Sequence, residues 1–114
     1  MKHLAWVERG WFQETFAGEA VPALDQPGDD NAVEFAVDPG DTVESVQAFY
    51  RGEVARSRAI TNAAQSLDAP SAEETRLLGR VSLRWLLVHM IEETARHAGH
   101  LDIMREEIDG TTGD

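Results

Sequence analysis

The sequence contains no cysteine and no long apolar run. A chain without cysteine cannot form disulfides, bind a metal through thiolates or use a cysteine nucleophile. A membrane-spanning helix needs about 18 or more consecutive apolar residues, so the lack of such a run argues against a membrane protein. Met1, Lys2 and His3 lead directly into an amphipathic segment, whereas a signal peptide would continue into an apolar region. We therefore expect a cytoplasmic protein.

Basic residues are also scarce. Ten Lys and Arg stand against 21 Asp and Glu, which gives a formal net charge of -11 at pH 7. A charge of this sign and size repels phosphate backbones and anionic membrane surfaces, so we expect neither nucleic acid nor membrane as a partner. The apolar fraction of 42% and the charged fraction of 27% are ordinary for a globular protein. A chain of 114 residues can bury one core, which predicts a single domain over residues 1–114.

Three segments have apolar residues at helical spacing. The first covers residues 3–16, and Gly18 is placed to end it. The second begins after Asp41, a capping residue with Glu44 three positions on. The third begins after Ser82, another capping residue, and runs to about Asp109. On a helical wheel the second segment presents one core-facing stripe, made of Val43, Val46, Phe49, Tyr50, Val54, Ile60, Ala64 and Leu67.

The intervening segments carry turn residues. Residues 19–40 predict a long loop, in which the alternation at 33–37 indicates either a short edge strand or an extended crossing. Residues 68–80 predict a connector with at most a short helical turn. The expected fold class is therefore all-α, with long helices running up and down.

The last helix places a carboxylate on its apolar face. Glu93 and His97 point the same way as the apolar residues Leu86, Met90, Leu101, Met104 and Ile108. Burying an ionised carboxylate without a partner costs several kcal/mol, so a metal, a cationic side chain or a proton must compensate it. His89 and His100 lie on the flanks of this face and are better interpreted as peripheral groups than as ligands.

A shared metal ion is one way to compensate Glu93. Imidazole and carboxylate together suit zinc, nickel or iron(II), and one straight helix cannot complete the coordination sphere. The only histidine outside the last helix is His3, which shares a helical face with Val7 and Trp11. The competing interpretation is an ordinary hydrogen-bonded Glu93/His97 pair, or a salt bridge from Glu93 to Arg51, Arg84 or another arginine.

A second kind of metal site is possible at the chain start. With a free α-amine, Met1, Lys2 and His3 can hold Cu(II) or Ni(II) in a square plane through the amine, two backbone amides and the imidazole. This site and the inter-helix site both need His3, so an experiment must tell them apart.

Two sequence blocks resemble the DinB superfamily: KHLAWVERGWF at residues 2–12 and VSLRWLLVHMIEETARHAGHLDIMREEIDG at residues 81–110. They are most similar to its actinobacterial branch, which is related to mycothiol-dependent maleylpyruvate isomerase and to mycothiol and bacillithiol S-transferases. The resemblance implies a helical bundle with a divalent metal, zinc or nickel, held by a histidine of an early helix and a Glu-xxx-His pair of the last. Carried over, the ligands would be His3, Glu93 and His97. Three protein ligands and an open position are typical of a catalytic site.

The resemblance also implies a chemistry. It indicates a metal-dependent S-transferase or isomerase that uses a low-molecular-weight thiol such as mycothiol as cosubstrate. The sulfur of this thiol would attack an electrophile. The alternatives are a DinB-like module that binds a metal or small molecule without turnover, and a helical dimerisation protein. Because only Met1 and Lys2 precede His3, the family's first helix is expected to be missing. Either the reading frame begins upstream of Met1, or the chain is a shortened member whose uncovered groove predicts a homodimer.

Overall fold

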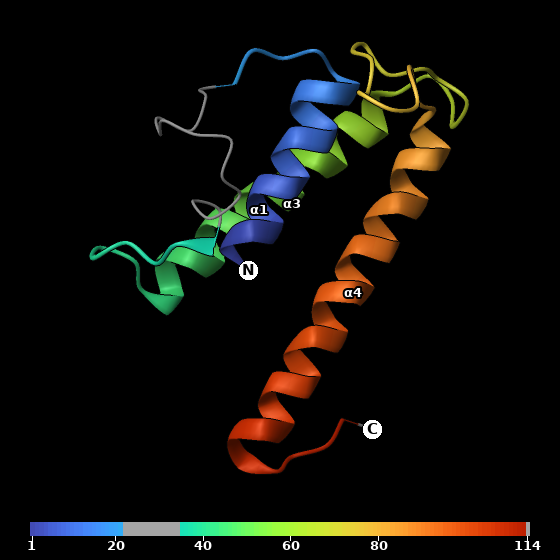
Figure 1. The fold of residues 1–114 in the computed structure, drawn as a ribbon. Coiled ribbons are helices and arrows are strands. Elements are labelled where there is room, and N and C mark those ends of the chain that lie inside the picture. The colour runs from blue at the N-terminus through green and yellow to red at the C-terminus, as the bar shows by residue number, and fades with distance from the viewer. Residues whose placement is uncertain (22–34, 114) are drawn as a thin grey trace.

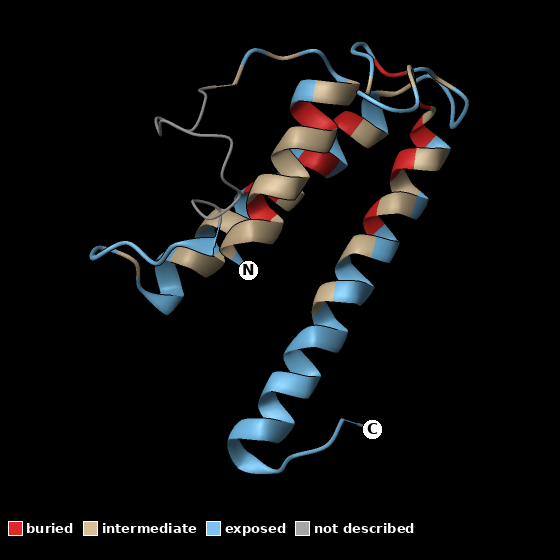
Figure 2. Cartoon of the chain, in the orientation of Figure 1, coloured by how far each residue is buried: buried red, intermediate tan, exposed pale blue. Residues whose placement is uncertain are grey.

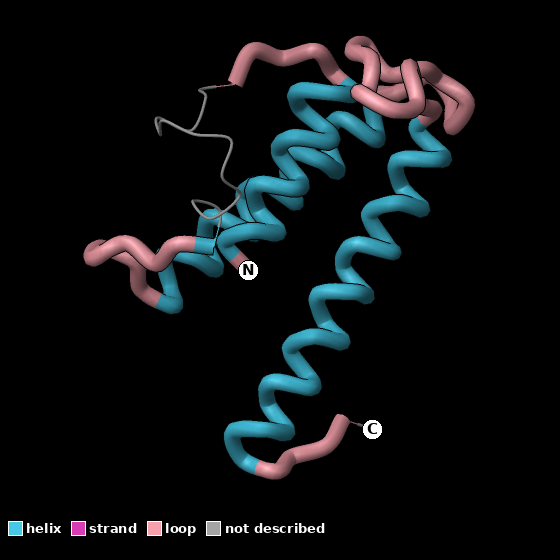
Figure 3. Tube along the Cα trace, viewed as in Figure 1, coloured by secondary structure: helices cyan, strands magenta, loops and turns pink. Residues whose placement is uncertain are grey.

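The computed structural model describes residues 1–21 and 35–113, and its regular structure is helical (Figure 1). The helices in chain order are α1 (Lys2–Glu8), the π-helix η1 (Arg9–Phe16), α3 (Val43–Ala63) and α4 (Leu83–Asp109). No strand occurs in the described ranges, as the tube in Figure 3 also shows. The prediction of an all-α fold is confirmed.

The first helical segment changes its winding midway. From Arg9 onward the backbone bonds span five residues, as in the bond from the Ala17 N–H to the Phe12 carbonyl at 3.0 Å, which is the π-helical pattern. Gly18 ends the segment with φ at +67°, a conformation that glycine adopts without strain. The spacing of apolar residues predicted the helix and its end but not the π-helical winding.

α3 begins one residue later than predicted. Thr42, not Asp41, is the capping residue: its hydroxyl accepts from the Ser45 N–H at 3.1 Å, and Ser45 Oγ accepts from the Thr42 N–H at 2.9 Å. Asp41 instead pairs with Lys2 at 2.8 Å. The second hydrogen bond of this capping box therefore involves the hydroxyl of Ser45, whereas the sequence predicted the carboxylate of Glu44 in that role.

The predicted stripe of the second helix is too long at both ends. Val43 is 70% exposed in the first turn of α3. The helix stops at Ala63, so Ala64 and Leu67 lie beyond it, although Ala64 still packs against the core cluster as predicted. The middle of the stripe is correct, since Ile60 is buried and Val54 is half-buried.

α4 has the predicted bounds. Ser82 Oγ accepts from the Trp85 N–H at 3.2 Å, and Gly110 ends the helix with φ at +73°. Only its first turns are buried, where Leu83, Leu86 and Met90 join Phe12 and Ile60 in the core cluster.

The C-terminal half of α4 projects away from the core. The prediction that its apolar residues are buried is wrong, because Leu101 and Met104 are each 56% exposed and Ile108 is 79% exposed. Figure 2 shows this half of the helix coloured as exposed while the first turns are buried. Periodicity predicts that one face of a helix is apolar, but it does not say whether another element is long enough to cover that face.

The connector before α4 is irregular, as predicted. It forms isolated bridges between Pro70 and Ser82 and between Thr75 and Gly79. Ser71 is buried in it, and its hydroxyl accepts from the Val81 N–H at 3.1 Å. The alternation at 33–37 lies partly outside the described residues; in its described part, residues 36 and 37 form no strand.

A buried polar network ties the first helical segment to α3. Glu53 is 8% exposed, and its carboxylate accepts from Arg9 Nη2 at 2.5 Å and from Gln13 Nε2 at 2.6 Å. The Arg9 guanidinium also lies over the rings of Trp6 and Phe49, 4.7 and 5.1 Å from their centroids. Burial alone would raise the pKa of Glu53, but the hydrogen bonds from Arg9 and Gln13 outweigh it and hold that pKa below its usual range.

We expect Glu53→Gln to lower the free energy of unfolding by about 2 kcal/mol near neutral pH, because the charge-assisted bond to Arg9 is lost. Because the folded-state pKa of Glu53 lies below its unfolded-state value, its stabilisation is complete above the unfolded-state pKa and is lost as the pH falls through the folded-state pKa. Urea unfolding at a series of pH values measures both effects. The exposed Glu106→Gln is the control and should match the wild type. The assignment is contradicted if the difference in free energy of unfolding between wild type and Glu53→Gln stays constant as the pH falls to the acid transition.

Candidate functional site

The structure brings together two histidines that are 94 positions apart in sequence. His3 lies in the first turn of α1 and His97 in the fourth turn of α4. Their Nε2 atoms are 3.1 Å apart, and their ring centroids are 4.6 Å apart with an interplanar angle of 61°. Two imidazole nitrogens at this distance can share one proton or direct their lone pairs at one cation.

Glu93 lies one helical turn before His97. Its Oε2 is 3.5 Å from His97 Nε2, and its Oε1 accepts from Arg96 Nη1 at 2.9 Å. The Glu93 side chain is only 15% exposed. Glu93 therefore has both partners that the sequence allowed, the histidine one turn on and an arginine, although the arginine is Arg96 and not Arg51 or Arg84.

The environment of His97 favours its neutral form. Burial lowers the pKa of His97, and the neighbouring His3 lowers it further. A neutral imidazole keeps the lone pair that a metal ion needs.

The spacing of these atoms can be compared with a metal site. Ligand bonds of 2.0–2.1 Å in a tetrahedron put neighbouring ligand atoms about 3.3 Å apart. The distances from His97 Nε2 to His3 and to Glu93 lie on either side of that value. Within residues 1–21 and 35–113, however, no three His, Asp or Glu side chains gather closely enough to form a metal-holding group. The donor types and two of the spacings fit a metal, and the complete three-ligand cluster is not assembled.

The other two histidines of α4 lie apart from this pair. His89 stacks on Trp85 with centroids 4.9 Å apart and meets Trp11 edge-on at 4.6 Å, so it belongs to an aromatic cluster. His100 is closer to the site, with its ring centroid 6.3 Å from that of His97.

Phe35 is a neighbour of His3 that the sequence did not predict. Its ring stacks on His3 with centroids 4.2 Å apart and an interplanar angle of 17°. The only sequence signal was its place in the 33–37 alternation, which gave no indication of a contact with the first helix.

A cavity of about 820 Å³ opens beside the histidine pair; we call it the histidine pocket. The start of α1, residues 35–37, the start of α3 and the far half of α4 form its walls. The residues used below are His3, Phe35, His97, Leu101, Ile103 and Met104.

Lys2 closes one wall of the histidine pocket. Its ammonium binds Asp38 at 2.5 Å and Asp41 at 2.8 Å, and it donates to the Ala36 carbonyl at 3.1 Å. The hydrogen bonds to Asp38 and Asp41 raise the pKa of Lys2, and the bond from Lys2 lowers the pKa of Asp41. These contacts hold residues 36–41 against the start of α1.

A second cavity of about 860 Å³ lies between the first helical segment, α3 and α4; we call it the inter-helix groove. Apolar side chains such as Phe12, Leu87 and Ile91 form most of it. Ser57 also lines it, is 4% exposed, and its hydroxyl interacts with the Glu8 carboxylate. Burial raises the pKa of Glu8 at its rim.

Comparisons with known proteins identify the family. No curated protein and no solved structure matches the chain. Among the described residues, no helix is both long enough and apolar enough to cross a membrane. The family model described as Mycothiol-S-transferase matches residues 1–110, which includes the first helical segment and all of α4. The chain therefore belongs to the mycothiol S-transferase family, a DinB-like family, as the resemblance of its two sequence blocks predicted.

Proposed function

We propose that this protein transfers a low-molecular-weight thiol, mycothiol or a close relative, to an electrophile, with a divalent metal held by His3, Glu93 and His97. The observation that carries the proposal is the 3.1 Å approach of the two Nε2 atoms from opposite ends of the chain. Membership of the mycothiol S-transferase family supports the thiol. The proposed place of action is the cytoplasm, where small thiols are kept reduced.

The chain has no cysteine, so the reacting sulfur belongs to the cosubstrate. A divalent metal, zinc or nickel, held by His3, Glu93 and His97 would supply positive charge that lowers the pKa of that thiol. In the transfer the S–H bond breaks and its proton goes to solvent, the sulfur electron pair forms a bond to the electrophilic carbon, and the leaving group departs with its electron pair.

The protein side chains have separate tasks in this scheme. His3 and His97 offer their imidazole Nε2 atoms, and Glu93 adds its carboxylate through Oε2. Arg96 holds the other oxygen of Glu93 and so restricts its rotation. Phe35, stacked on His3, limits the tilt of that ring.

A binding module without turnover is the second candidate. The observation that favours it is the Arg96–Glu93 pair, which satisfies the carboxylate without a metal, together with the lack of a complete three-ligand cluster among the described residues. Measured turnover separates this candidate from the first.

We also propose that the protein is a homodimer whose second copy covers the inter-helix groove. The accessible surface is 8062 Å², whereas a compact chain of this mass exposes about 6,200 Å². The radius of gyration is 15.7 Å against about 13 Å for a compact domain. Part of this excess is apolar, since Ile91 on the groove is 69% exposed. A standard interface takes about 800 Å² from each partner, which the excess can supply.

For the dimer, sedimentation at micromolar concentration should give twice the chain mass, and Ile91→Glu should give the chain mass because it places a charge in the groove. Ile108→Glu, on the same helix but outside the groove, is the control and should stay dimeric. A wild-type protein that sediments as a compact monomer would contradict the proposal.

For the metal, elemental analysis of purified protein should give close to one zinc or nickel per chain, and His97→Ala should lose it. His89→Ala is the matched control, because His89 lies on the same helix in the aromatic cluster and should leave the metal content unchanged. Folded protein that is metal-free and takes up neither ion would overturn the site.

A Cu(II) or Ni(II) ion at the first three residues must be distinguished from this site. Glu93→Gln should weaken metal binding at the site formed by His3, Glu93 and His97. It should leave the square-planar absorption band of a metal bound at the first three residues unchanged. Extra residues placed before Met1 should abolish the terminal band and retain zinc bound by His3, Glu93 and His97. Metal binding that Glu93→Gln leaves unchanged and that extra residues before Met1 abolish would not belong to the site formed by His3, Glu93 and His97.

For turnover, mycothiol and a bimane electrophile should give a fluorescent conjugate at a rate that depends on the protein. His97→Ala should lower kcat/KM by at least about 100-fold, because it removes a metal ligand. His89→Ala should stay within about threefold of wild type. Metal-loaded, folded protein that gives no conjugate with any thiol–electrophile pair would favour the binding module.

A further inference from the structure

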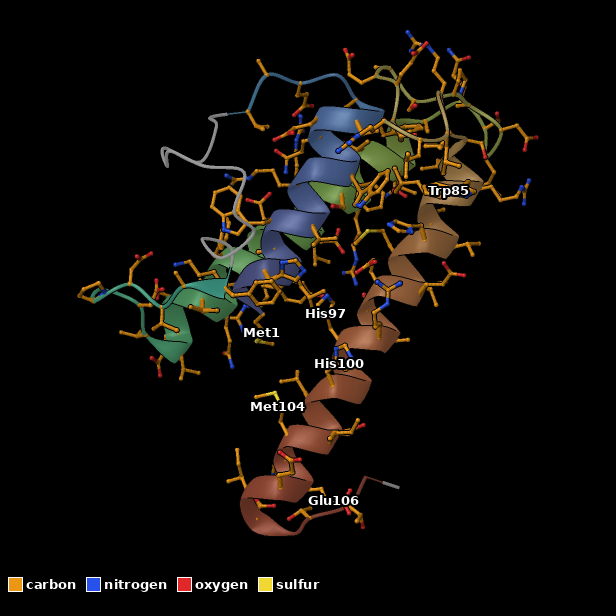
Figure 4. All side chains as sticks on the ribbon, viewed as in Figure 1. Met1, Trp85, His97, His100, Met104 and Glu106 are labelled. Atoms are coloured by element: carbon orange, nitrogen blue, oxygen red, sulfur yellow. The ribbon has the colours of Figure 1, made fainter. Side chains whose placement is uncertain are left out.

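One wall of the histidine pocket is formed by the segment that leads into α3. This segment, residues 35–41, is called the strap below, and it lines the pocket through Phe35, Ala36, Val37 and Asp41. The opposite wall is the far half of α4, where the exposed apolar side chains are Leu101, Ile103 and Met104. Figure 4 shows His97, His100 and Met104 along this half of α4, with Met1 at the start of α1 across from them.

A single side chain fastens the strap to α1. Lys2 Nζ donates to Asp38 at 2.5 Å, to Asp41 at 2.8 Å and to the Ala36 carbonyl at 3.1 Å, which uses all three N–H donors of an ammonium group. In the part of the chain that the structure describes, the other hydrogen bonds of the strap are internal and join Asp38 to Asp41, each through one backbone N–H, at 2.9 Å. Lys2 therefore makes every described hydrogen bond between the strap and α1.

The strap also covers the ring of His3. Phe35 stacks on His3 with centroids 4.2 Å apart and an interplanar angle of 17°, and its centroid is 6.4 Å from that of His97. The Ala36 carbonyl that Lys2 binds belongs to the residue after Phe35, and Lys2 itself precedes His3. The hydrogen bonds of Lys2 and the stacking of Phe35 thus join the same two short segments, so loss of one weakens the other.

The strap has no apolar anchor in the core. Phe35 is 59% exposed and Val37 is 84% exposed. The buried core cluster is made of residues from η1, α3 and α4 and includes no residue of the strap. Segments with few buried apolar contacts open at a lower free-energy cost than packed helices. The strap is therefore the wall of the pocket that can move, and the bonds of Lys2 oppose that movement.

We infer that the strap is a movable cover of the histidine pocket and that Lys2 is its latch. While the latch is closed, Phe35 holds the His3 ring in the orientation that brings its Nε2 to His97. When the latch opens, the stack is lost and the pocket opens along residues 35–37. Lys2 is thus a positioning residue that acts on His3 through Phe35. Its effect on thiol transfer rests on the proposed function, whereas the coupling of Lys2, Phe35 and His3 needs neither thiol nor metal.

Proton NMR of the His3 ring tests this coupling. A proton above the face of an aromatic ring resonates upfield, so the His3 ring protons should lie at least about 0.3 ppm upfield of their positions in Phe35→Leu. The spectra are recorded with a chelator present at about pH 8.5, where an ordinary imidazole is neutral. The His3 signals are those missing from the spectrum of His3→Gln. Lys2→Met should move them most of the way to their Phe35→Leu positions.

Two controls separate the latch from a general effect of charge. Arg105→Met removes a cation that is also paired with an aspartate, but on α4 outside the pocket, and should leave the His3 signals in place. In the Phe35→Leu background, Lys2→Met should cause no further shift, because only a direct effect of Lys2 on its neighbour His3 would persist there. The latch is refuted if Lys2→Met shifts the His3 signals equally in both backgrounds or does not shift them in the wild-type background.

Release of zinc tests whether the strap covers the proposed metal site. Lys2→Met should speed the transfer of bound zinc to a chelator by about tenfold, whereas Arg105→Met should not. Zinc that leaves Lys2→Met at the wild-type rate overturns the cover. Coupling of Lys2, Phe35 and His3 in a protein that binds no zinc and transfers no thiol upholds the latch and refutes the proposed function. Thiol transfer by a protein whose His3 signals do not respond to Lys2→Met upholds the proposed function and refutes the latch.

Discussion

The attachment of α4 at one end is the constraint on which the rest of the structure depends. Leu83, Leu86 and Met90 bury the first turns of this helix against Phe12 and Ile60, and beyond Met90 no residue of the helix is fully buried. The rest of α4 is therefore positioned by this short contact and by the stiffness of its own backbone hydrogen bonds. Glu93 and His97 lie just past the anchored part, where the helix is close enough to α1 for a contact with His3.

The first helical segment has the opposite character, because it is held along its whole length. The Arg9–Glu53–Gln13 network fixes it to α3, and Lys2 fixes its start to residues 36–41. His3 thus belongs to a firmly held element, while His97 belongs to a projecting one. The candidate site forms between the two.

Local signals predicted the parts of the fold that depend on neighbouring residues. Ser82 and Gly110 bound α4 as expected, because capping and left-handed glycine are decided within a few residues. The cap of α3 moved from Asp41 to Thr42 because Asp41 has a partner in Lys2, a distant contact that the sequence does not reveal. A distant feature also decides the exposure of Leu101 and Met104. Their spacing correctly places them on one face of α4, but whether that face is buried depends on the length of the helices opposite. For the site, helical spacing placed Glu93 and His97 together and the family resemblance pointed to His3, whereas Phe35 approaches His3 through a loop that carries no periodic signal.

Because α4 is held at one end, a small tilt there displaces residues further along the helix by a larger distance. From Leu83 to His97 is 14 residues, or about 21 Å along the axis at 1.5 Å per residue. A tilt of about 5° at the Leu83 end displaces His97 by about 2 Å, which is as long as a whole metal–nitrogen bond. The volume of the side chains around Leu86 therefore affects how closely His97 approaches His3, and a change of one methyl group in the core alters the distance between the two Nε2 atoms about three turns further along the helix.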